Sequence, residues 1–293
     1  MPQTPAHSGS ATIADVVRQA ASRLAGPDAR RETELLLEHV LDVDRAWLFT
    51  HANEPIEAQI KARLDELIER RKQGEPVAYI LGRAGFWTLD LIVGPATLVP
   101  RPETELLVEV ALEYLPADQD RCVADLGTGS GAIALALGRE RPQARILATD
   151  ASEAALTIAR GNAERNAVAN VEFRCGSWFE PVQGMRFHLI ASNPPYVADD
   201  DPHLQQGDLR FEPDMALSCG PDGMDAIRQI IVGAGPYLHR DGWLILEHGL
   251  DQGAAVRELL QAAGFAQVQT RRDLEDRDRI SLGLWSGRSH TGP

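Results

Sequence analysis

The sequence predicts an α/β protein in which a mostly parallel sheet has helices on both faces and follows a small helical domain. From residue 121 onward, short apolar runs typical of buried strands alternate with longer runs of helical spacing. Such alternation is typical of parallel sheets, because the crossover between two parallel strands is usually a helix. Between about residues 11 and 73, apolar residues recur only at helical spacing.

The length of 293 residues is enough for two domains. We predict an N-terminal helical domain over 1–77, which would pack against the rest or dock a partner. Residues 78–99, in which Gly and Pro separate short β-like runs, are expected to form a hairpin-like connector. Residues 100–293 form the predicted sheet domain. The two polar ends, 1–10 and 287–293, are expected to be disordered.

Helical spacing marks the elements of the first domain. Thr12 and Asp15 form an N-cap signal at the start of the first predicted helix. Runs at 35–41 and 60–68 predict two more helices. The apolar positions of the first helix are Ile13, Val16, Val17, Ala20 and Leu24.

In the sheet domain, residues 100–115 are expected to form a turn followed by a helix. The last two predicted strands have no helix between them, so an antiparallel hairpin is expected at the sheet edge. The predicted strands are 122–126, 145–150, 171–176, 187–193, 242–249, 265–270 and 279–285. The predicted helices between them are 131–140, 153–167, 223–235 and 251–263.

Composition weighs against several classes of function. The formal net charge is −14, with −3 in residues 1–77 and −11 in the remainder, so the surface is expected to repel a phosphate backbone. Stable binding to nucleic acid is therefore not expected, whereas a basic protein partner would be attracted. The N-terminus lacks the apolar segment of a secretory signal, and no run approaches the roughly 20 apolar residues that span a bilayer. We expect a cytoplasmic protein without membrane contact.

No metal site is expected. The chain has three cysteines without a C-x-x-C pair, and its eight histidines show no H-E-x-x-H or similar ligand spacing. We interpret the cysteines as small core residues.

A glycine-rich turn follows the first predicted strand. Glycine permits positive φ and close approach to a ligand, and such a turn at the start of a helix often holds a nucleotide-like ligand. Asp150 ends the next predicted strand, where an acid can bind both hydroxyls of a ribose. The pattern D-x-G-x-G-x-G resembles the S-adenosylmethionine site of the seven-stranded methyltransferases; the alternative is a turn without a ligand. The turn comprises Asp125, Leu126, Gly127, Thr128, Gly129, Ser130 and Gly131.

The motif Asn193-Pro194-Pro195-Tyr196 follows the apolar run 187–192, the fourth predicted strand. Proline cannot donate to a strand ladder, so the strand should end here. Because ligands of open α/β sheets bind outside the carboxyl ends of the strands, the motif should lie beside the glycine turn. A residue before proline is held extended, which gives the Pro194 carbonyl and the Asn193 side chain fixed directions.

Two acceptors with fixed directions suit a planar NH2 group, which has two N–H donors. Its nitrogen is a poor nucleophile, so orienting it toward an electrophilic methyl group would provide most of the help that the reaction needs. No strong base is required, because the proton can leave after methylation. Tyr196 is expected to form an aromatic wall against the substrate. The alternative is that the prolines only end the strand.

Several segments together resemble the HemK/PrmC family, the peptide chain release factor N5-glutamine methyltransferases. The resemblance runs from the helical N-terminal part to residues 277–280. It implies a seven-stranded, Rossmann-like fold that uses S-adenosylmethionine to methylate the glutamine of the Gly-Gly-Gln motif in class 1 release factors. The segments are GEPVAYILG (74–82), FW (86–87), LVPRPETE (98–105), ADLGTGSGAIA (124–134), SNPPYV (192–197) and EP–AL–GPDG (212–223).

The resemblance also implies roles for individual residues. Gly127 through Gly131 would line the methionine and ribose of S-adenosylmethionine, and Asp150 would bind the ribose hydroxyls. Trp178 would lie near the adenine; the alternative is that it is ordinary core packing. Asn193 would contact cofactor and substrate, and residues 193–196 would hold the glutamine amide.

Four other residues receive no role from the sequence. Arg101, Glu103 and Glu105 either begin a helix, with acids in its first turn, or lie near the mouth of the active site. His248 follows the fifth predicted strand, where it would support or pack against its neighbours rather than act as a base.

Two other functions remain open at this point. An enzyme with the same N-P-P-Y geometry could methylate an exocyclic amine of adenine or cytosine in nucleic acid. The acidic net charge disfavours this function. The other function is that of a non-catalytic module that binds S-adenosylmethionine and docks on release factor or ribosome. The complete N-P-P-Y motif disfavours it.

Overall fold

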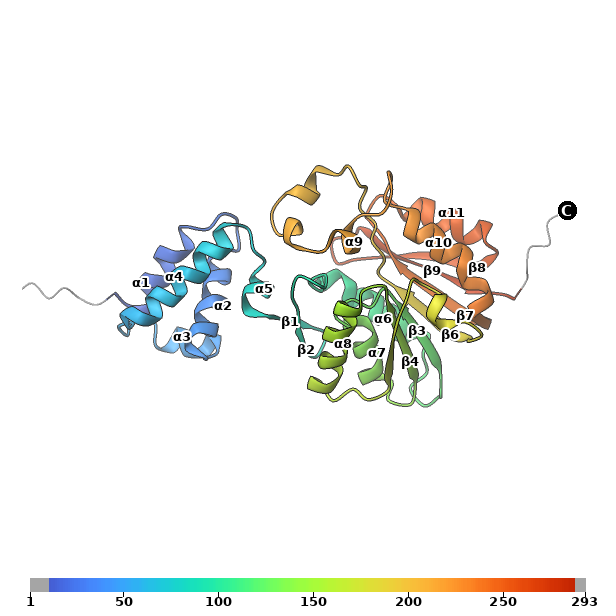
Figure 1. The fold of residues 1–293 in the computed structure, drawn as a ribbon, viewed down its shortest axis with the longest axis horizontal. Coiled ribbons are helices and arrows are strands. Elements are labelled where there is room, and N and C mark those ends of the chain that lie inside the picture. The colour runs from blue at the N-terminus through green and yellow to red at the C-terminus, as the bar shows by residue number, and fades with distance from the viewer. Residues whose placement is uncertain (1–10, 288–293) are drawn as a thin grey trace, which may run out of the picture. The chain divides into compact units, whose positions relative to one another are not determined.

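The computed structural model describes residues 11–287 and divides into two units, Met1–Leu81 and Gly82–Pro293 (Figure 1). The expectation of disordered ends therefore falls almost wholly outside the described residues. Each unit has its own hydrophobic core.

The first unit is helical, as predicted. Leu36, Leu37, Leu64 and Ile68 are fully buried where α2 and α4 pack together. The short helices α3 and α5 were not predicted, because neither is long enough to show a helical period. The helices are α1 (Ile13–Ala21), α2 (Ala29–Leu41), α3 (Arg45–Thr50), α4 (Ala58–Lys72) and α5 (Val77–Leu81).

The predicted N-cap of α1 is confirmed. The Asp15 backbone N–H donates to Thr12 Oγ1 at 3.2 Å, and the Thr12 backbone N–H donates to the Asp15 carboxylate at 3.3 Å. Two N–H groups at the start of the helix are thus satisfied by side chains.

The second unit is built on one sheet. Among the described residues, seven strands pair in the order β5-β4-β3-β6-β7-β9-β8, parallel except that β9 runs antiparallel to both its neighbours. The chain winds outward from β3 in one direction and then crosses to β6, so the order reverses between β3 and β6. The strands are β3 (Cys122–Leu126), β4 (Arg145–Asp150), β5 (Val171–Cys175), β6 (Phe187–Ser192), β7 (Leu238–Glu247), β8 (Phe265–Arg272) and β9 (Asp278–Trp285).

Helices cover both faces of this sheet, which confirms the predicted fold class. Helices α6, α7 and α8 pack side by side, and α10 and α11 pack together on the other face (Figure 1). The longer helices are α6 (Glu105–Glu113), α7 (Ala132–Glu140), α8 (Glu153–Arg165), α10 (Asp225–Ala234) and α11 (Gly253–Ala262). The short ones are η1 (Pro102–Thr104), η2 (Glu180–Val182), η3 (Pro202–Gln205), η4 (Leu209–Phe211), α9 (Asp214–Leu217) and η5 (Gly235–Tyr237).

The segment expected as a connector, 78–99, divides between the two units. Its first residues belong to α5, whereas strands β1 (Arg83–Phe86) and β2 (Leu89–Ile92) form an antiparallel hairpin in the second unit. Two side-chain amides of α8 hold this hairpin in the manner of a neighbouring strand. Asn162 Oδ1 accepts from Ile92 N at 2.6 Å, and Asn166 Oδ1 accepts from Asp90 N at 3.1 Å.

No helix among the described residues combines the length and the apolar character that crossing a membrane requires.

Candidate active site

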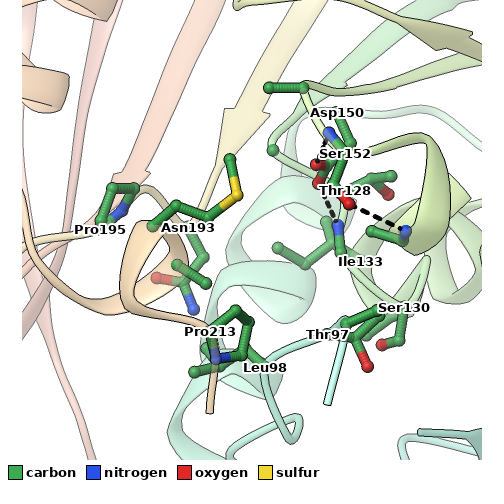
Figure 2. Close-up of a pocket in the computed structure, with 18 of the residues that line it drawn as sticks. Thr97, Leu98, Thr128, Ser130, Ile133, Asp150, Ser152, Asn193, Pro195 and Pro213 are labelled. Carbon is green, nitrogen blue, oxygen red and sulfur yellow. Dashed lines mark hydrogen bonds between the residues drawn. The ribbon is translucent and has the colours of Figure 1, made fainter. Parts of the chain in front are cut away.

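A cavity of about 370 Å³ lies in the second unit at the carboxyl ends of β3, β4 and β6, where the strand order reverses (Figure 2). This is the position at which open α/β sheets bind ligands, and the volume suits a small molecule. The cavity is not lined by Gly131, Pro194 or Tyr196. The predicted site residues that line it are Gly127, Thr128, Gly129, Ser130, Asp150, Trp178, Asn193 and Pro195.

The backbone of the glycine turn explains its glycines. Gly127, Gly129 and Gly131 have φ values of 75°, 55° and 87°, a region that residues with a Cβ seldom adopt. At Gly131, the N-cap of α7, a Cβ would also lie 3.1 Å from the Leu135 side chain. Gly131 therefore shapes the turn and lets α7 pack, while Gly127 and Gly129 expose their backbone to the cavity.

Asp150 is fixed by the turn that it faces. Its Oδ2 accepts from Gly129 N at 2.8 Å, and its Oδ1 accepts from Ser152 N at 2.9 Å. Each carboxylate oxygen has a second lone pair, so both can accept another hydrogen bond from a ligand hydroxyl.

The sequence assigned no role to Asp125, although this acid begins the glycine motif. It is fully buried, and its Oδ2 accepts from Thr128 Oγ1 at 2.6 Å and from Ala134 N at 3.2 Å. Burial raises the pKa of its carboxyl to about 7. Asp125 therefore ties the turn to the first residues of α7. In the sequence, an acid near the end of an otherwise apolar strand was the feature that could have indicated this role.

Trp178 both lines the cavity and packs against the core of the sheet domain. Its φ of 42° is unusual for a bulky residue and indicates local strain. A Cβ on Gly127 would lie 3.4 Å from the Trp178 ring, so the indole closes the space above the glycine turn.

Asn193 enters the cavity directly after β6 ends. Its Nδ2 group donates to Thr104 Oγ1 at 3.2 Å, and Thr104 also lines the cavity. Tyr196 does not face the cavity, because its hydroxyl turns to Glu247 Oε1 at 3.3 Å and its ring packs against the core. The structure thus brings Asn193 and Pro195 to the cavity and places Tyr196 behind them.

Contacts from several loops hold the backbone of the N-P-P-Y motif. Ser192 Oγ donates to Leu126 O at 2.6 Å, which joins the ends of β6 and β3. Gln252 Nε2 donates to Tyr196 O at 3.0 Å. Gly223, with φ of 69°, lies so close that a Cβ would be 2.2 Å from the same carbonyl oxygen. The motif is therefore held by residues distant in the chain, with Leu126 before it and Gly223 and Gln252 after it.

The segment 198–219 forms another wall of the cavity through Pro213, Met215 and Ser218. A buried carboxylate fixes it: Glu212 accepts from Val99 N at 2.9 Å and pairs with the Arg101 guanidinium. Arg101, which received no role from the sequence, thus lines the cavity and holds this wall.

The two acids that follow Arg101 do not line the cavity. Glu103 is exposed. Glu105 accepts from Trp87 N at 2.6 Å and so links α6 to the turn of the β1–β2 hairpin.

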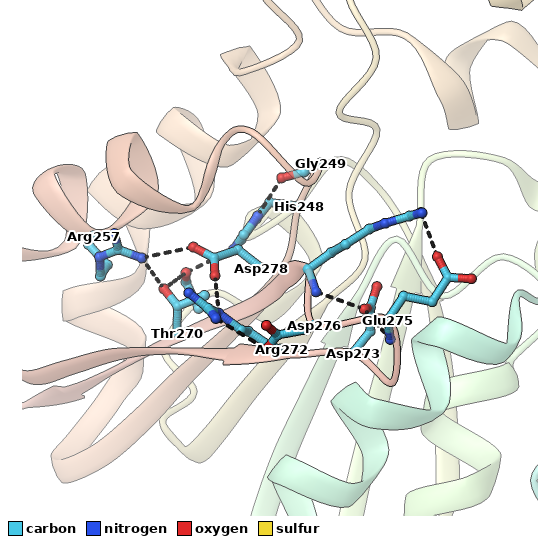
Figure 3. A network of polar contacts seen from close by, with 11 residues as sticks. His248, Gly249, Arg257, Thr270, Arg272, Asp273, Glu275, Asp276 and Asp278 are labelled. Carbon is cyan, nitrogen blue, oxygen red and sulfur yellow. Dashed lines mark hydrogen bonds and ion pairs between the residues drawn. The ribbon is translucent and has the colours of Figure 1, made fainter.

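His248 is buried in a polar network between β7, β8 and β9 (Figure 3). Its Nδ1–H donates to Gly249 O at 2.8 Å, since a carbonyl can only accept, and its Nε2 therefore accepts from Ser281 Oγ at 2.9 Å. Arg257 and Thr270 continue the chain behind Ser281. Burial lowers the pKa of His248, so the ring stays neutral. This geometry agrees with support rather than catalysis.

A pH-dependent stability is expected from His248. Its folded pKa lies below the unfolded value of about 6.5, so the unfolded chain binds the proton more readily and stability falls as pH decreases through about 6.5. Burial raises the pKa values of Asp125 and Glu247 to about 7, so their contribution to stability rises as pH decreases over the same range. Urea unfolding of the wild type and His248→Gln at pH 5.5 and 8 isolates the histidine: the variant should lose less stability on acidification. Equal losses would contradict the assignment.

Among the described residues, no three histidine, cysteine or acidic side chains gather as metal ligands would.

Models of two protein families match this chain. The PrmC N-terminal domain matches residues 15–82, and the methyltransferase small domain matches residues 103–208. Among solved structures, a methyltransferase from Pyrococcus furiosus superposes with a TM-score of 0.53 at 20% identity, over 76% of this chain and 98% of that one. This likeness concerns the fold alone.

Two curated relatives are much closer in sequence. A release factor glutamine methyltransferase of Xylella fastidiosa strain Temecula1 is 58% identical over 258 residues, covering 88% of this chain and 94% of that protein. The release factor glutamine methyltransferase of Pseudomonas aeruginosa is 54% identical over 260 residues, covering 89% and 94%. With more than half of the aligned positions shared over almost the full length of both relatives, the chain belongs to the family of release factor glutamine methyltransferases.

Proposed function

We propose that this enzyme transfers a methyl group from S-adenosylmethionine to the side-chain amide nitrogen (N5) of the glutamine in the Gly-Gly-Gln motif of class 1 release factors. The observation that supports it most is the position of Asn193. An amide at the end of β6 shares one cavity with a glycine turn and Asp150, in a chain of this family.

The residues of the cavity fit S-adenosylmethionine. Gly127 and Gly129 leave room that a Cβ would fill, and both oxygens of Asp150 can accept from ribose hydroxyls. Trp178 would lie near the adenine. When bound, S-adenosylmethionine supplies a methyl group made electrophilic by its sulfonium sulfur.

On the substrate side, the Asn193 side-chain oxygen and the carbonyl of Pro194, which adjoins Asn193 but does not itself line the cavity, would accept hydrogen bonds from the two N–H groups of the glutamine amide. These two hydrogen bonds would orient the nitrogen and restrict the rotation of the amide group. One proton leaves once the new N–C bond has formed, so acceptors with fixed directions serve better than a strong base. Tyr196 would support the motif from behind through its contact with Glu247.

The test of this function offers labelled S-adenosylmethionine with unmodified release factor, with DNA and with ribosomal RNA in separate reactions. Label is expected in the release factor only, and a Gln→Ala change in its Gly-Gly-Gln motif should abolish it. Label confined to nucleic acid would support exocyclic-amine methylation instead. Binding of S-adenosylmethionine without any transfer would support a docking module.

Asp150→Asn should weaken the binding of S-adenosylmethionine by roughly tenfold or more, because a charged acceptor is lost and an NH2 group would face an N–H donor. Calorimetric titration measures the change. The matched control is Asp120→Asn, an acid that pairs with Arg145 at the surface. Equal affinity in both variants would refute the role of Asp150.

We further propose that the N-terminal helical domain, 1–77, takes part in docking the release factor, and that the reaction takes place in the cytoplasm, where translation ends. The net charge of −14 supports a protein partner over a nucleic acid.

A further inference from the structure

Glu247 is a buried acid that the proposed reaction does not use directly. It ends β7, its side chain is 1% exposed, and it lies behind the N-P-P-Y motif. Its Oε1 accepts from the Tyr196 hydroxyl at 3.3 Å. Its Oε2 is buried and has no hydrogen-bond partner among the described residues, although the neighbouring Thr104 hydroxyl lowers the pKa of the carboxyl.

The number of available donors determines the direction of the hydrogen bonds around Glu247. The Thr104 hydroxyl accepts from Asn193 Nδ2 at 3.2 Å and has a single proton of its own to donate. The Glu247 carboxylate can only accept, and its Oε2 has no other donor, so the Thr104 proton is the one available to it. With the Thr104 proton turned to this oxygen, the hydrogen bonds from Asn193 through Thr104 would all run toward Glu247.

We propose that Glu247 is a positioning residue: acting through the Thr104 hydroxyl, its carboxylate makes Asn193 turn its NH2 group inward and present its oxygen to the amide nitrogen that is to be methylated. An asparagine amide could otherwise rotate by half a turn and offer a donor where the substrate also has a donor. This inference rests on the proposed glutamine methylation. It adds the group that orients the Asn193 oxygen, which accepts from the substrate amide.

The surroundings of Glu247 make this control dependent on pH. Burial raises the pKa of its carboxyl to about 7, whereas Thr104, Arg279 of β9 and Tyr196 act to lower it and Glu103 of η1 acts to raise it. Arg101 faces the same region through Tyr196, and Asp273 partly neutralises Arg279. A protonated Glu247 would itself donate, and Thr104 could then turn its proton toward Asn193. Turnover should therefore rise with pH through about 7.

The experiment compares wild type with Glu247→Gln from pH 5.5 to 9, with unmodified release factor and S-adenosylmethionine both saturating. Glutamine keeps the shape of the side chain but always offers an NH2 donor. The ratio of wild-type to variant kcat should be near one at pH 5.5 and grow to about tenfold or more above pH 8. KM for the release factor should stay within about twofold of the wild-type value, because the hydrogen bonds to the glutamine amide stabilise mainly the transition state.

Asp125, whose pKa burial also raises to about 7, is present in both proteins, so the ratio cancels its titration. A ratio that does not change with pH, whatever its size, would overturn the inference, because a merely structural loss would not follow the ionisation of residue 247.

A second pair of variants keeps the test decisive if Glu247→Gln folds poorly. Thr104→Val keeps the shape of the side chain and removes the hydroxyl, so its kcat should fall about as far as that of Glu247→Gln. Thr104→Ser restores the hydroxyl and should recover most of that turnover. Equal kcat in the two Thr104 variants would overturn the inference. A wild-type enzyme that leaves the release factor unmethylated would instead refute the proposed function itself.

Discussion

Replacing Asn193 by alanine is expected to lower kcat by about two to three orders of magnitude, the size of effect seen when one preorganised polar group of an active site is removed. Alanine removes the oxygen that would accept from the substrate amide and the NH2 group that bonds to Thr104. The measurement is single-turnover methylation of unmodified release factor. Affinity for S-adenosylmethionine should weaken less, because the glycine turn and Asp150 remain.

Two further variants define what this loss means. Asn193→Asp keeps oxygen acceptors but cannot donate to Thr104, so it should also be slow if orientation matters. Gln143→Ala removes an exposed amide just before β4 begins, at the opposite end of the sheet from the cavity, and should turn over at the wild-type rate. Unchanged turnover in Asn193→Ala would refute its catalytic role.

Gly223→Ala is expected to disturb both stability and turnover. The new Cβ would lie 2.2 Å from the Tyr196 carbonyl oxygen, and the residue would keep a φ of 69°. Steric overlap and a left-handed backbone together should cost about 3 kcal/mol in the free energy of unfolding. Relief of the overlap would move the backbone of the N-P-P-Y motif, and a displacement of about 1 Å can reduce turnover by about a hundredfold.

The matched control is Gly184→Ala. Gly184 has a φ of 76°, and a Cβ there would meet nothing within 4 Å, so this variant carries the backbone cost without the overlap. It should lose about 1–2 kcal/mol and retain its kcat. Urea unfolding and the methylation assay measure both variants. Equal behaviour of the two would show that the contact between Gly223 and Tyr196 has no effect on the site.

Much of the fold followed from local pattern. The predicted strands 122–126 and 145–150 agree with β3 and β4 at both ends, because their apolar residues are buried on both faces and charged or turn residues bound them. The same reasoning failed for α3 and α9, which are six and four residues long. Over such lengths a helical period cannot be distinguished from other patterns.

The sequence predicted the glycine turn and the N-P-P-Y motif because each is contiguous and depends on backbone rules that act within a few residues. It did not predict that Tyr196 would turn away from the cavity. A ring after two prolines could face either side, and the side was decided by Glu247, 51 residues further along the chain. The same holds for Glu212, which reaches back to Arg101 and Val99.

The sequence by itself determined the fold class, the family and the two segments where the chemistry is expected. Periodicity, glycine and proline act locally, so they can be recognised in one dimension. Only the tertiary structure decided which polar side chains face one another: Thr104, Asn193 and Glu247 come from three elements far apart in the chain and meet because β6 and β7 end at the same edge of the sheet. The direction of a hydrogen-bond chain depends on all its members at once, and that direction assigns Glu247 a role that no motif indicated.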